Sequence, residues 1–229
     1  MKIRLGIIGE EDNINIFQEV IEEYNDYKIA TFTDADGTHT LNIIDTHQQE
    51  VDAWLVFDQI NYLHIKNWGK AQKPVYCIPY RGANFYKTLC TTIYQGFKID
   101  ELSIDTIPYY DITRALDDMQ INYNVINHLS DEYGALSLNG YAEFHRELFK
   151  KGITKAAVTR SCYVKSLLER EGIPAFCIMP VRVTVRNILN VILTQFRIKK
   201  LREGQIAVQV FSFNLLGDKD NFYSVDDLY

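Results

Sequence analysis

The most regular pattern of apolar and polar positions runs from residue 155 to residue 188. It begins with the short apolar run 156–159, which predicts a strand buried on both faces, and a polar turn follows. Apolar residues at helical spacing then lead to Gly172, which suits a helix C-terminus because glycine accepts positive φ. A second apolar run, 173–179, ends at Pro180, where another helix begins. The segment therefore predicts a strand-helix-strand-helix unit.

This unit also predicts where a ligand binds. Two parallel strands joined by a helix cross over right-handedly, so the turns at 159–162 and 179–184 lie on the same edge of the sheet. Open α/β sheets bind ligands at that edge, and helix N-termini there favour anions. The polar residues near these N-termini are Arg160, Ser161, Arg182, Thr184 and Arg186. They predict a site for a small anion; the alternative is that the arginines are solvated or pair with surface carboxylates.

The first part of the chain shows the same alternation of apolar runs and helical patterns. Buried strands are predicted at 3–9, 27–33, 52–58 and 74–79. The first helix is expected to begin with Asp12 or Asn13 as its N-cap, and further helices at 38–50, 62–70 and 85–95. Gly6 and Gly9 lack a third glycine at the spacing of a dinucleotide-binding loop, and no phosphate loop is present.

The second part repeats this architecture without repeating the sequence. Strands are predicted at 102–107 and 123–127, a turn at 109–111, a loop at 130–139, and helices at 112–119 and 141–151. The helix 181–202 follows the unit described above, and 205–211 alternates like an edge strand, although a helix is also compatible. We therefore predict an α/β protein of two flavodoxin-like lobes, similar in plan to periplasmic binding proteins, with parallel sheets around a central cleft. The expected divisions are a first lobe at 1–98, a second lobe with an exit helix at 99–203, and an edge strand or linker towards a possible output domain at 204–229.

Composition narrows the class of protein. The chain of 229 residues suffices for two lobes of about 100 residues each. A formal charge of −6 argues against nucleic-acid binding by the chain as a whole, and no apolar stretch is long enough for a membrane span. We expect a cytoplasmic protein that contacts no membrane, and DNA only through a region outside this chain.

Residues that could support metal or nucleophilic chemistry are scattered. The four cysteines include no C-x-x-C pair, and the histidines show no i, i+4 pairing, so we expect no metal, no cofactor and no disulfide. His145 lies among charged residues of a helix, which favours a solvated face, whereas His128 follows a strand and is a candidate for the cleft. An enzymatic alternative is a cofactor-independent racemase or lyase that uses Cys162, since such enzymes place one cysteine at a strand end of each lobe. The first lobe has Asp58 there instead of a cysteine.

Several stretches together resemble the N-terminal effector-sensing domain of propionate-catabolism activators and related bacterial transcription regulators. They are the opening strand IRLGIIG, the strands DAWLVFD and PVYCIP, the segment LSIDTIPYYDITRAL and, most specific, the run from Gly152 to Leu189, GITKAAVTRSCYVKSLLEREGIPAFCIMPVRVTVRNIL. The resemblance implies a receptor, not an enzyme, whose two lobes hold a small carboxylated metabolite and whose last helix passes the signal to an output domain. The ATPase and helix-turn-helix regions of that family are absent from these 229 residues.

The predicted ligand site combines strand ends from both lobes. We expect hinge closure near Gly96 and, from the many aromatic residues, a homodimer. Arg81 and Arg160 would clamp acidic groups of the metabolite through paired hydrogen bonds. The predicted ligand-binding residues are Asp58, Gln59, Arg81, Tyr110, Arg160, Ser161, Arg182 and Thr184.

Overall fold

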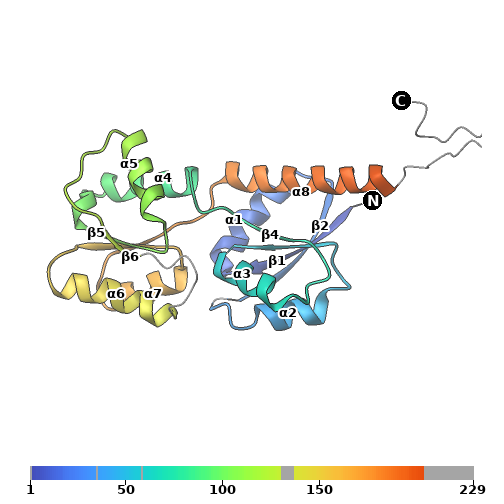
Figure 1. Cartoon of the computed structure of the whole chain (residues 1–229), viewed down its shortest axis with the longest axis horizontal. Coiled ribbons are helices and arrows are strands. Elements are labelled where there is room, and N and C mark those ends of the chain that lie inside the picture. Colours follow the sequence, from blue (N-terminus) through green and yellow to red (C-terminus); the bar gives the residue numbers. More distant parts are fainter. Residues whose placement is uncertain (1, 35, 58, 130–136, 204–229) are drawn as a thin grey trace, which may run out of the picture. The chain divides into compact units, whose positions relative to one another are not determined.

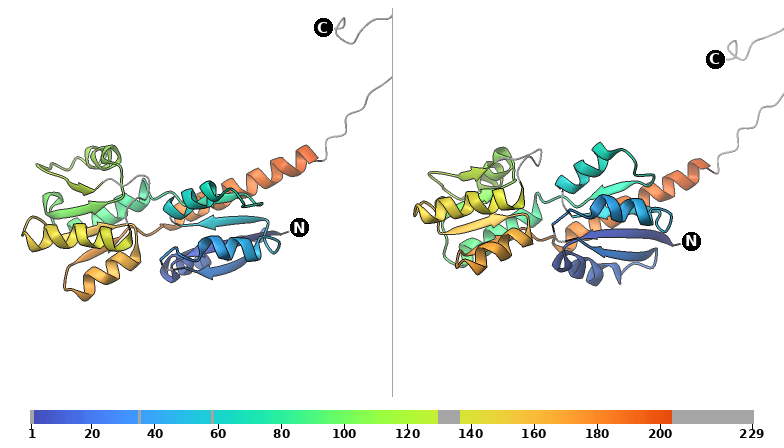
Figure 2. Two further views of the ribbon diagram at one scale, coloured as in Figure 1. Left: turned by 60° about the horizontal axis from the view of Figure 1, so that its bottom comes forward. Right: turned by 90° about the horizontal axis from the view of Figure 1, so that it is seen from below.

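The computed structural model describes residues 2–34, 36–57, 59–129 and 137–203, and it contains two four-stranded parallel sheets. The first sheet has the order β2-β1-β3-β4 and the second the order β6-β5-β7-β8. Helices lie on both sides of each sheet (Figures 1 and 2). The predicted α/β class with two flavodoxin-like lobes is therefore confirmed. Asp58, most of the loop predicted at 130–139 and the segment 204–229 lie outside the described residues.

Seven of the eight strands form at the predicted runs; the strand predicted at 123–127 was wrong in its bounds, because residues 127–129 form the strand instead. The first sheet consists of β1 (Ile3–Gly9), β2 (Tyr27–Thr33), β3 (Ala53–Val56) and β4 (Val75–Cys77). The second sheet consists of β5 (Leu102–Asp105), β6 (Asn127–Leu129), β7 (Ala156–Thr159) and β8 (Ala175–Cys177). The central strands β3, β5 and β7 are buried at every position, as expected when helices cover both faces of a parallel sheet.

The helices of the first sequence half mostly follow the predicted pattern. They are α1 (Glu11–Ile21), α2 (Thr40–His47), α3 (Gln59–Trp68) and α4 (Ala83–Tyr94), followed by a 3-10 turn (Ile99–Glu101). The predicted N-cap of α1 was wrong: Glu10 occupies that position, without a side-chain bond to the helix, and Asp12 and Asn13 are inside it.

The second half contributes α5 (Tyr109–Asp118), α6 (Leu138–Lys150), α7 (Cys162–Arg170) and α8 (Arg182–Glu203). The turn predicted at 109–111 is instead the first turn of α5, because Pro108 at its N-cap position leads directly into helical residues. Ser161 caps α7 by accepting a 3.3 Å hydrogen bond from the Val164 amide.

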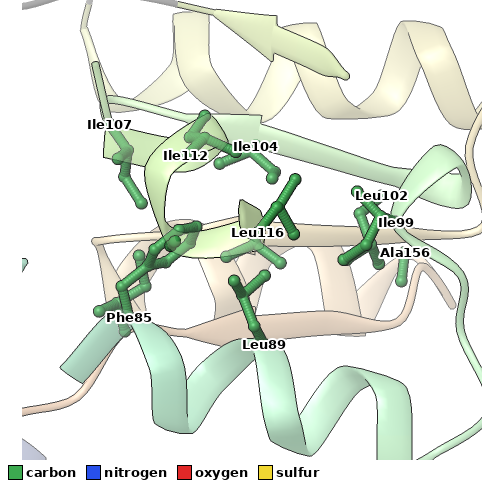
Figure 3. Close-up of a cluster of buried hydrophobic side chains, with 12 residues drawn as sticks. Phe85, Leu89, Ile99, Leu102, Ile104, Ile107, Ile112, Leu116 and Ala156 are labelled. Atoms are coloured by element: carbon green, nitrogen blue, oxygen red, sulfur yellow. The ribbon is translucent and has the colours of Figure 1, made fainter. Parts of the chain in front are cut away.

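Two helices pack on a different sheet from the one that the sequence predicted. Figure 3 shows Phe85 and Leu89 of α4 packed with Leu102, Ile104 and Leu116 in the core of the second sheet. Helix α4 was predicted in the first lobe, and the order of elements along the chain does not reveal that it packs on the second sheet. Gly96 therefore lies between two segments of one core, which removes the basis for a hinge there.

Helix α8 shows the converse. Its residues Val185, Leu189 and Ile192 are buried, and the Leu189 carbonyl accepts a hydrogen bond from Tyr27 Oη of β2. The part of α8 up to residue 194 thus packs on the first sheet, although it was predicted with the second lobe. The chain passes from one sheet to the other after β4 and returns after β8; the exact domain limits at residues 98 and 203 stay predictions.

Candidate functional site

A cavity of about 70 Å³ lies where five strands of the two sheets end. In each sheet the chain order reverses between the two central strands, β1 and β3 or β5 and β7, and such switch points are where open α/β sheets bind ligands. Typical ligand pockets measure about 300–1,000 Å³. A metabolite too large for this cavity therefore requires its walls, which come from the two sheets, to separate. The lining includes Ile8, Gly9, Glu10, Asn13, Asp34, Asp36, Gly37, Phe57, Asn61, Asp105, Thr106, Leu138, Tyr141, Thr159, Arg160 and Ser161.

Asp34 lines this cavity and carries an acceptor without a hydrogen-bond partner among the described residues. It directly follows β2, is 5% exposed, and is held by its amide, which donates to the Gly9 carbonyl at 3.0 Å. Asp34 Oδ2 accepts a 2.6 Å hydrogen bond from Thr40 Oγ1, whereas Oδ1 has no hydrogen-bond partner among the described residues. A buried acceptor without a partner is costly, so Oδ1 is a natural contact for a donor group of a ligand.

The rim beside Asp34 is shaped by a tight turn. Asp36 Oδ1 accepts from the side chain and the amide of Thr38, at 2.7 and 3.0 Å, and these bonds lower the pKa of Asp36. Gly37 has a φ of 74°, and a Cβ atom there would stand 2.5 Å from the Asn61 amide oxygen. The turn therefore requires glycine at position 37 and fixes a carboxylate at the mouth of the cavity.

Glu10 crosses from the end of β1 to the N-terminus of α7. Its Oε1 accepts a 3.3 Å hydrogen bond from Ser161 Oγ, and the nearby amides of Cys162 and Tyr163 favour its charged form. Burial raises the pKa of Glu10, while the neighbouring Cys162 thiol, the Tyr163 and Cys162 amides and the Ser161 hydroxyl work in the opposite direction. The helix terminus predicted to bind an external anion is therefore occupied by a carboxylate of the protein itself.

Asp105 forms the floor of the cavity and belongs to a buried polar network. Its Oδ2 lies 3.1 Å from His145 Nε2, and Oδ1 accepts from Thr106 Oγ1 at 2.8 Å. His145 Nδ1 lies 2.7 Å from Ser103 Oγ, and His145, Ser103 and Asp105 are all at most 1% exposed. The solvated position predicted for His145 was therefore wrong, because the ring points into the core from α6.

Thr106 adds a strained backbone at the same place. It has a φ of 56°, a left-handed conformation that is rare for a β-branched residue. Its amide donates to the Leu129 carbonyl at 3.0 Å, which holds this conformation. Strained residues of this kind gather at binding sites, and Thr106 lines the cavity.

Arg160 supplies the positive charge of the cavity. Its guanidinium carbon lies 4.0 Å from the centre of the Tyr80 ring, a cation–π arrangement, and its amide donates weakly to Asp105 Oδ1 at 3.4 Å. Within the described lining, Arg160 is the one Lys or Arg side chain, against the four carboxylates of Glu10, Asp34, Asp36 and Asp105. The balance of charge around the cavity is thus acidic, in contrast to the cationic site that the arginines suggested.

The other predicted site residues are dispersed. Arg81 Nε pairs with Asp111 Oδ2 at 2.9 Å, and Tyr110 is 66% exposed on α5. Thr184 is buried and donates to Asn84 Oδ1 at 3.0 Å, while Gln59 begins α3 without lining the cavity. Only Arg160 and Ser161 of the eight predicted residues line this cavity within the described part of the chain.

Two of the arginines pair with surface carboxylates, which was the alternative to an anion site. Arg182 Nη2 pairs with Glu19 at 2.7 Å, and Arg186 pairs with both oxygens of Glu23 at 2.7 and 2.8 Å. These pairs join α8 to α1 at the surface and do not face the cavity.

The residues proposed for enzymatic chemistry also have structural partners. Cys162 lies outside the described lining of the cavity, and its contact with the Cys177 thiol, followed by burial, raises its pKa, which is unfavourable for a thiolate base. His128 Nε2 lies 2.6 Å from the Ile107 carbonyl, so it donates a hydrogen bond that ties β6 to the loop after β5. Neither residue is arranged for proton abstraction in the cavity.

Metal sites and membrane spans are two further features for which the described residues are informative. No group of three or more His, Cys, Asp or Glu side chains suited to a metal ion occurs in the described ranges. No helix of the described chain is long and apolar enough to cross a membrane.

The fold is similar to that of a known transcription regulator. Over 87% of this chain and 99% of the other, the structure matches an NtrC-family transcriptional regulator from Clostridium acetobutylicum with a TM-score of 0.64 and 15% identity. Weaker likenesses include a LacI-family regulator from Enterococcus faecium with bound ribose, at a TM-score of 0.36, 14% identity and coverage of 74% and 72% of the two chains. The TM-score of the second likeness is below 0.5, so it supports no argument. The first likeness, at 15% identity, is evidence of the fold alone. No protein-family model matches the sequence, and no curated protein matches it.

Proposed function

We propose that this chain is the ligand-sensing domain of a bacterial transcription regulator and that it binds a small polar metabolite in the cavity between the strand ends. The observation that carries the proposal is Asp34, a carboxylate that follows β2, lines that cavity, is 5% exposed and has no hydrogen-bond partner for Oδ1 among the described residues. The fold shared with a transcription regulator over nearly the whole of both chains supports the same class.

The arrangement of charges indicates which ligands suit the cavity. Asp34 and Asp36 contribute acceptors from the first sheet, and Asp105 closes the floor from the second. Hydroxyl or ammonium groups supply the donors that such acceptors need. A ligand rich in these groups, such as a polyol, a sugar or an amino compound, fits better than a simple anion.

The cavity gives less support to the carboxylated metabolite that was predicted from the sequence. Arg160 lines one wall and stacks on Tyr80, and Glu10 lies at the N-terminus of α7. A ligand carboxylate would have to displace Glu10 or bind Arg160 alone. A zwitterion, with its ammonium at Asp34 and its carboxylate at Arg160, satisfies both walls.

Signal output is proposed to run through α8 to a region beyond this chain, through which the regulator contacts DNA in the cytoplasm. Val191, Ile198 and Leu201 of α8 are 45%, 44% and 72% exposed and are spaced by seven and three residues. That spacing is typical of a coiled-coil seam, which supports the proposed homodimer. Analytical ultracentrifugation of the wild type and of Val191→Asp tests it: we expect a dimer that the substitution weakens, and a wild-type monomer at high concentration would contradict it.

A thermal-shift screen tests the binding function. The panel contains polyols, sugars, amino acids, polyamines and carboxylates, because a ligand that binds only the folded state raises the melting temperature in proportion to the logarithm of its concentration at saturation. We expect a hit among compounds with hydroxyl or ammonium groups, with no consumption of that compound on prolonged incubation. Hits confined to simple carboxylates would contradict the ligand class, and turnover of the compound would contradict the sensor.

A further inference from the structure

Three sulfur-bearing side chains meet outside the cavity described above. Cys162 begins α7, Cys177 ends β8, and Met179 follows two residues later. The Cys162 thiol donates to Met179 Sδ at 3.2 Å, and the neighbouring Cys177 thiol donates to the Arg160 carbonyl at 3.6 Å. Residues from two different elements thus bring two thiols and one thioether to one place.

The sulfur cluster of Cys162, Cys177 and Met179 opens into a cavity of its own. This cavity of about 580 Å³ is lined by all three residues and by side chains of α1, α4 and α7. Cys162 is 8% exposed, while Cys177 and Met179 are half-buried. An ion can therefore reach sulfur atoms that are largely withdrawn from water.

We propose that the sulfur cluster of Cys162, Cys177 and Met179 is a binding site for one soft monovalent metal ion of the Cu(I) class. Thiolate and thioether ligands select such ions, whereas Mg²⁺ and Ca²⁺ require oxygen ligands. A zinc site of the usual kind needs four nitrogen, sulfur or oxygen ligands, and the cluster offers three sulfurs. The absence of a C-x-x-C pair, which argued against a metal in the sequence, does not apply to cysteines that the fold brings together from different elements.

Binding requires only a small separation of Cys162 and Met179. With metal–sulfur distances of about 2.3 Å, three sulfurs around one ion lie about 4 Å apart, so Cys162 and Met179 would separate by under about 1 Å. The flexible methionine side chain absorbs such a shift. The ion displaces one proton from each thiol, and both protons leave to solvent, so that two thiolates and the thioether hold the ion without any change of oxidation state.

The surrounding charges set the pH dependence of the site. Both thiols must lose their protons before they can hold the ion, so the ion competes with protons for the site. Lys87 of α4 and Lys165 of α7 line the same cavity and offset the added negative charge, whereas Asp12 and Glu169 oppose it. Affinity should therefore rise with pH.

The test is an anaerobic titration of the reduced protein with Cu(I) against a chromophoric Cu(I) chelator. We expect one tightly bound ion per chain. Cys162→Ser and Cys177→Ser should each weaken binding by roughly 100-fold or more, since loss of an outer-shell partner alone costs about 10- to 100-fold. Met179→Leu should weaken it less, because a thioether carries no charge.

Cys90→Ser and Cys77→Ser are matched controls, since Cys90 is exposed on α4 and Cys77 ends β4 of the other sheet. Both should bind Cu(I) as the wild type does. Equal affinity of the wild type and of the Cys162→Ser/Cys177→Ser double variant would overturn the proposal, as would a dependence on Cys90. If Cys162→Ser does not fold, Cys177→Ser and Met179→Leu decide by the same criterion.

Discussion

Glu10 Oε1 accepts a hydrogen bond of 3.3 Å from Ser161 Oγ, although the two residues are 151 positions apart in the chain. The bond links the end of β1 in the first sheet to the N-cap of α7 beside the second. It also explains why the polar turn after β7 does not present a vacant anion site: the protein supplies its own carboxylate.

Replacing Glu10 should change how stability depends on pH. Burial raises the pKa of Glu10 above its ordinary value of 4.5, so the folded state holds this proton more tightly than the unfolded state does. The resulting stabilisation is fully present below pH 4.5 and is lost as the pH rises through the folded-state value. Relative to Glu10→Gln, the wild type should therefore gain stability as the pH falls from 7.5 towards 4.5.

Urea unfolding of both proteins at several pH values measures this difference. Glu11→Gln is the control, because Glu11 is the exposed neighbour in the first turn of α1. Parallel pH profiles for the wild type and Glu10→Gln would show that Glu10 is not buried as described.

His145 should contribute strongly to stability. His145→Gln removes a ring that contacts Ser103 and Asp105 at once, and it leaves at least one buried polar group without its partner. We expect a loss of about 1–3 kcal/mol in the free energy of unfolding. The same substitution at the exposed His64 should change it by less than about 0.5 kcal/mol, and equal effects at the two positions would contradict the network.

Arg160 and Tyr80 should be energetically coupled. Their guanidinium-to-ring distance of 4.0 Å predicts a coupling of about 0.5–2 kcal/mol in a double-mutant cycle of Arg160→Ala and Tyr80→Ala. The matched cycle uses Arg81→Ala, since Arg81 lies 5.7 Å from the same ring and pairs with Asp111. A larger coupling for Arg81 than for Arg160 would refute the stacked geometry.

Gly6 should not tolerate a side chain. A Cβ atom at this buried position of β1 would stand 2.5 Å from the Trp54 ring, which is fully buried and has no room to move away. Gly6→Ala should destabilise the protein by about 1–3 kcal/mol in chemical denaturation. Gly172→Ala, where the added Cβ meets nothing within 4 Å and only the positive φ opposes it, should cost less; the reverse order would count against the packing at Trp54.

Most strands were predictable because they are short apolar runs closed by a polar residue or a proline, whereas β6 (Asn127–Leu129) is not such a run and was predicted at 123–127. Which of the two sheets a helix packs on could not be predicted. Helices α4 and α8 each pack on the sheet that does not precede them in sequence. Local patterns contain no information about such an exchange.

Only part of the site was predicted, because some of its residues show no local signal in the sequence. Arg160 and Ser161 follow a predicted strand, whereas Asp105 lay inside the strand predicted at 102–107 and only the structure shows that β5 ends there. For His145 a signal existed: Tyr141 and Ala142 lie one turn earlier, so the helical period places the ring on their buried side. The charged neighbours Glu143 and Arg146, which face outward, concealed it.

The most direct test of the sensing site is the affinity of Asp34→Asn for the compound with the largest effect in the thermal-shift screen, measured by isothermal titration calorimetry. Asp45→Asn, an exposed position on α2, is the control. If Asp34 Oδ1 binds a donor of the ligand, Asp34→Asn should lose roughly tenfold or more in affinity while remaining folded, and Asp45→Asn should bind as the wild type does. Unchanged affinity in a folded Asp34→Asn variant would contradict the proposed site.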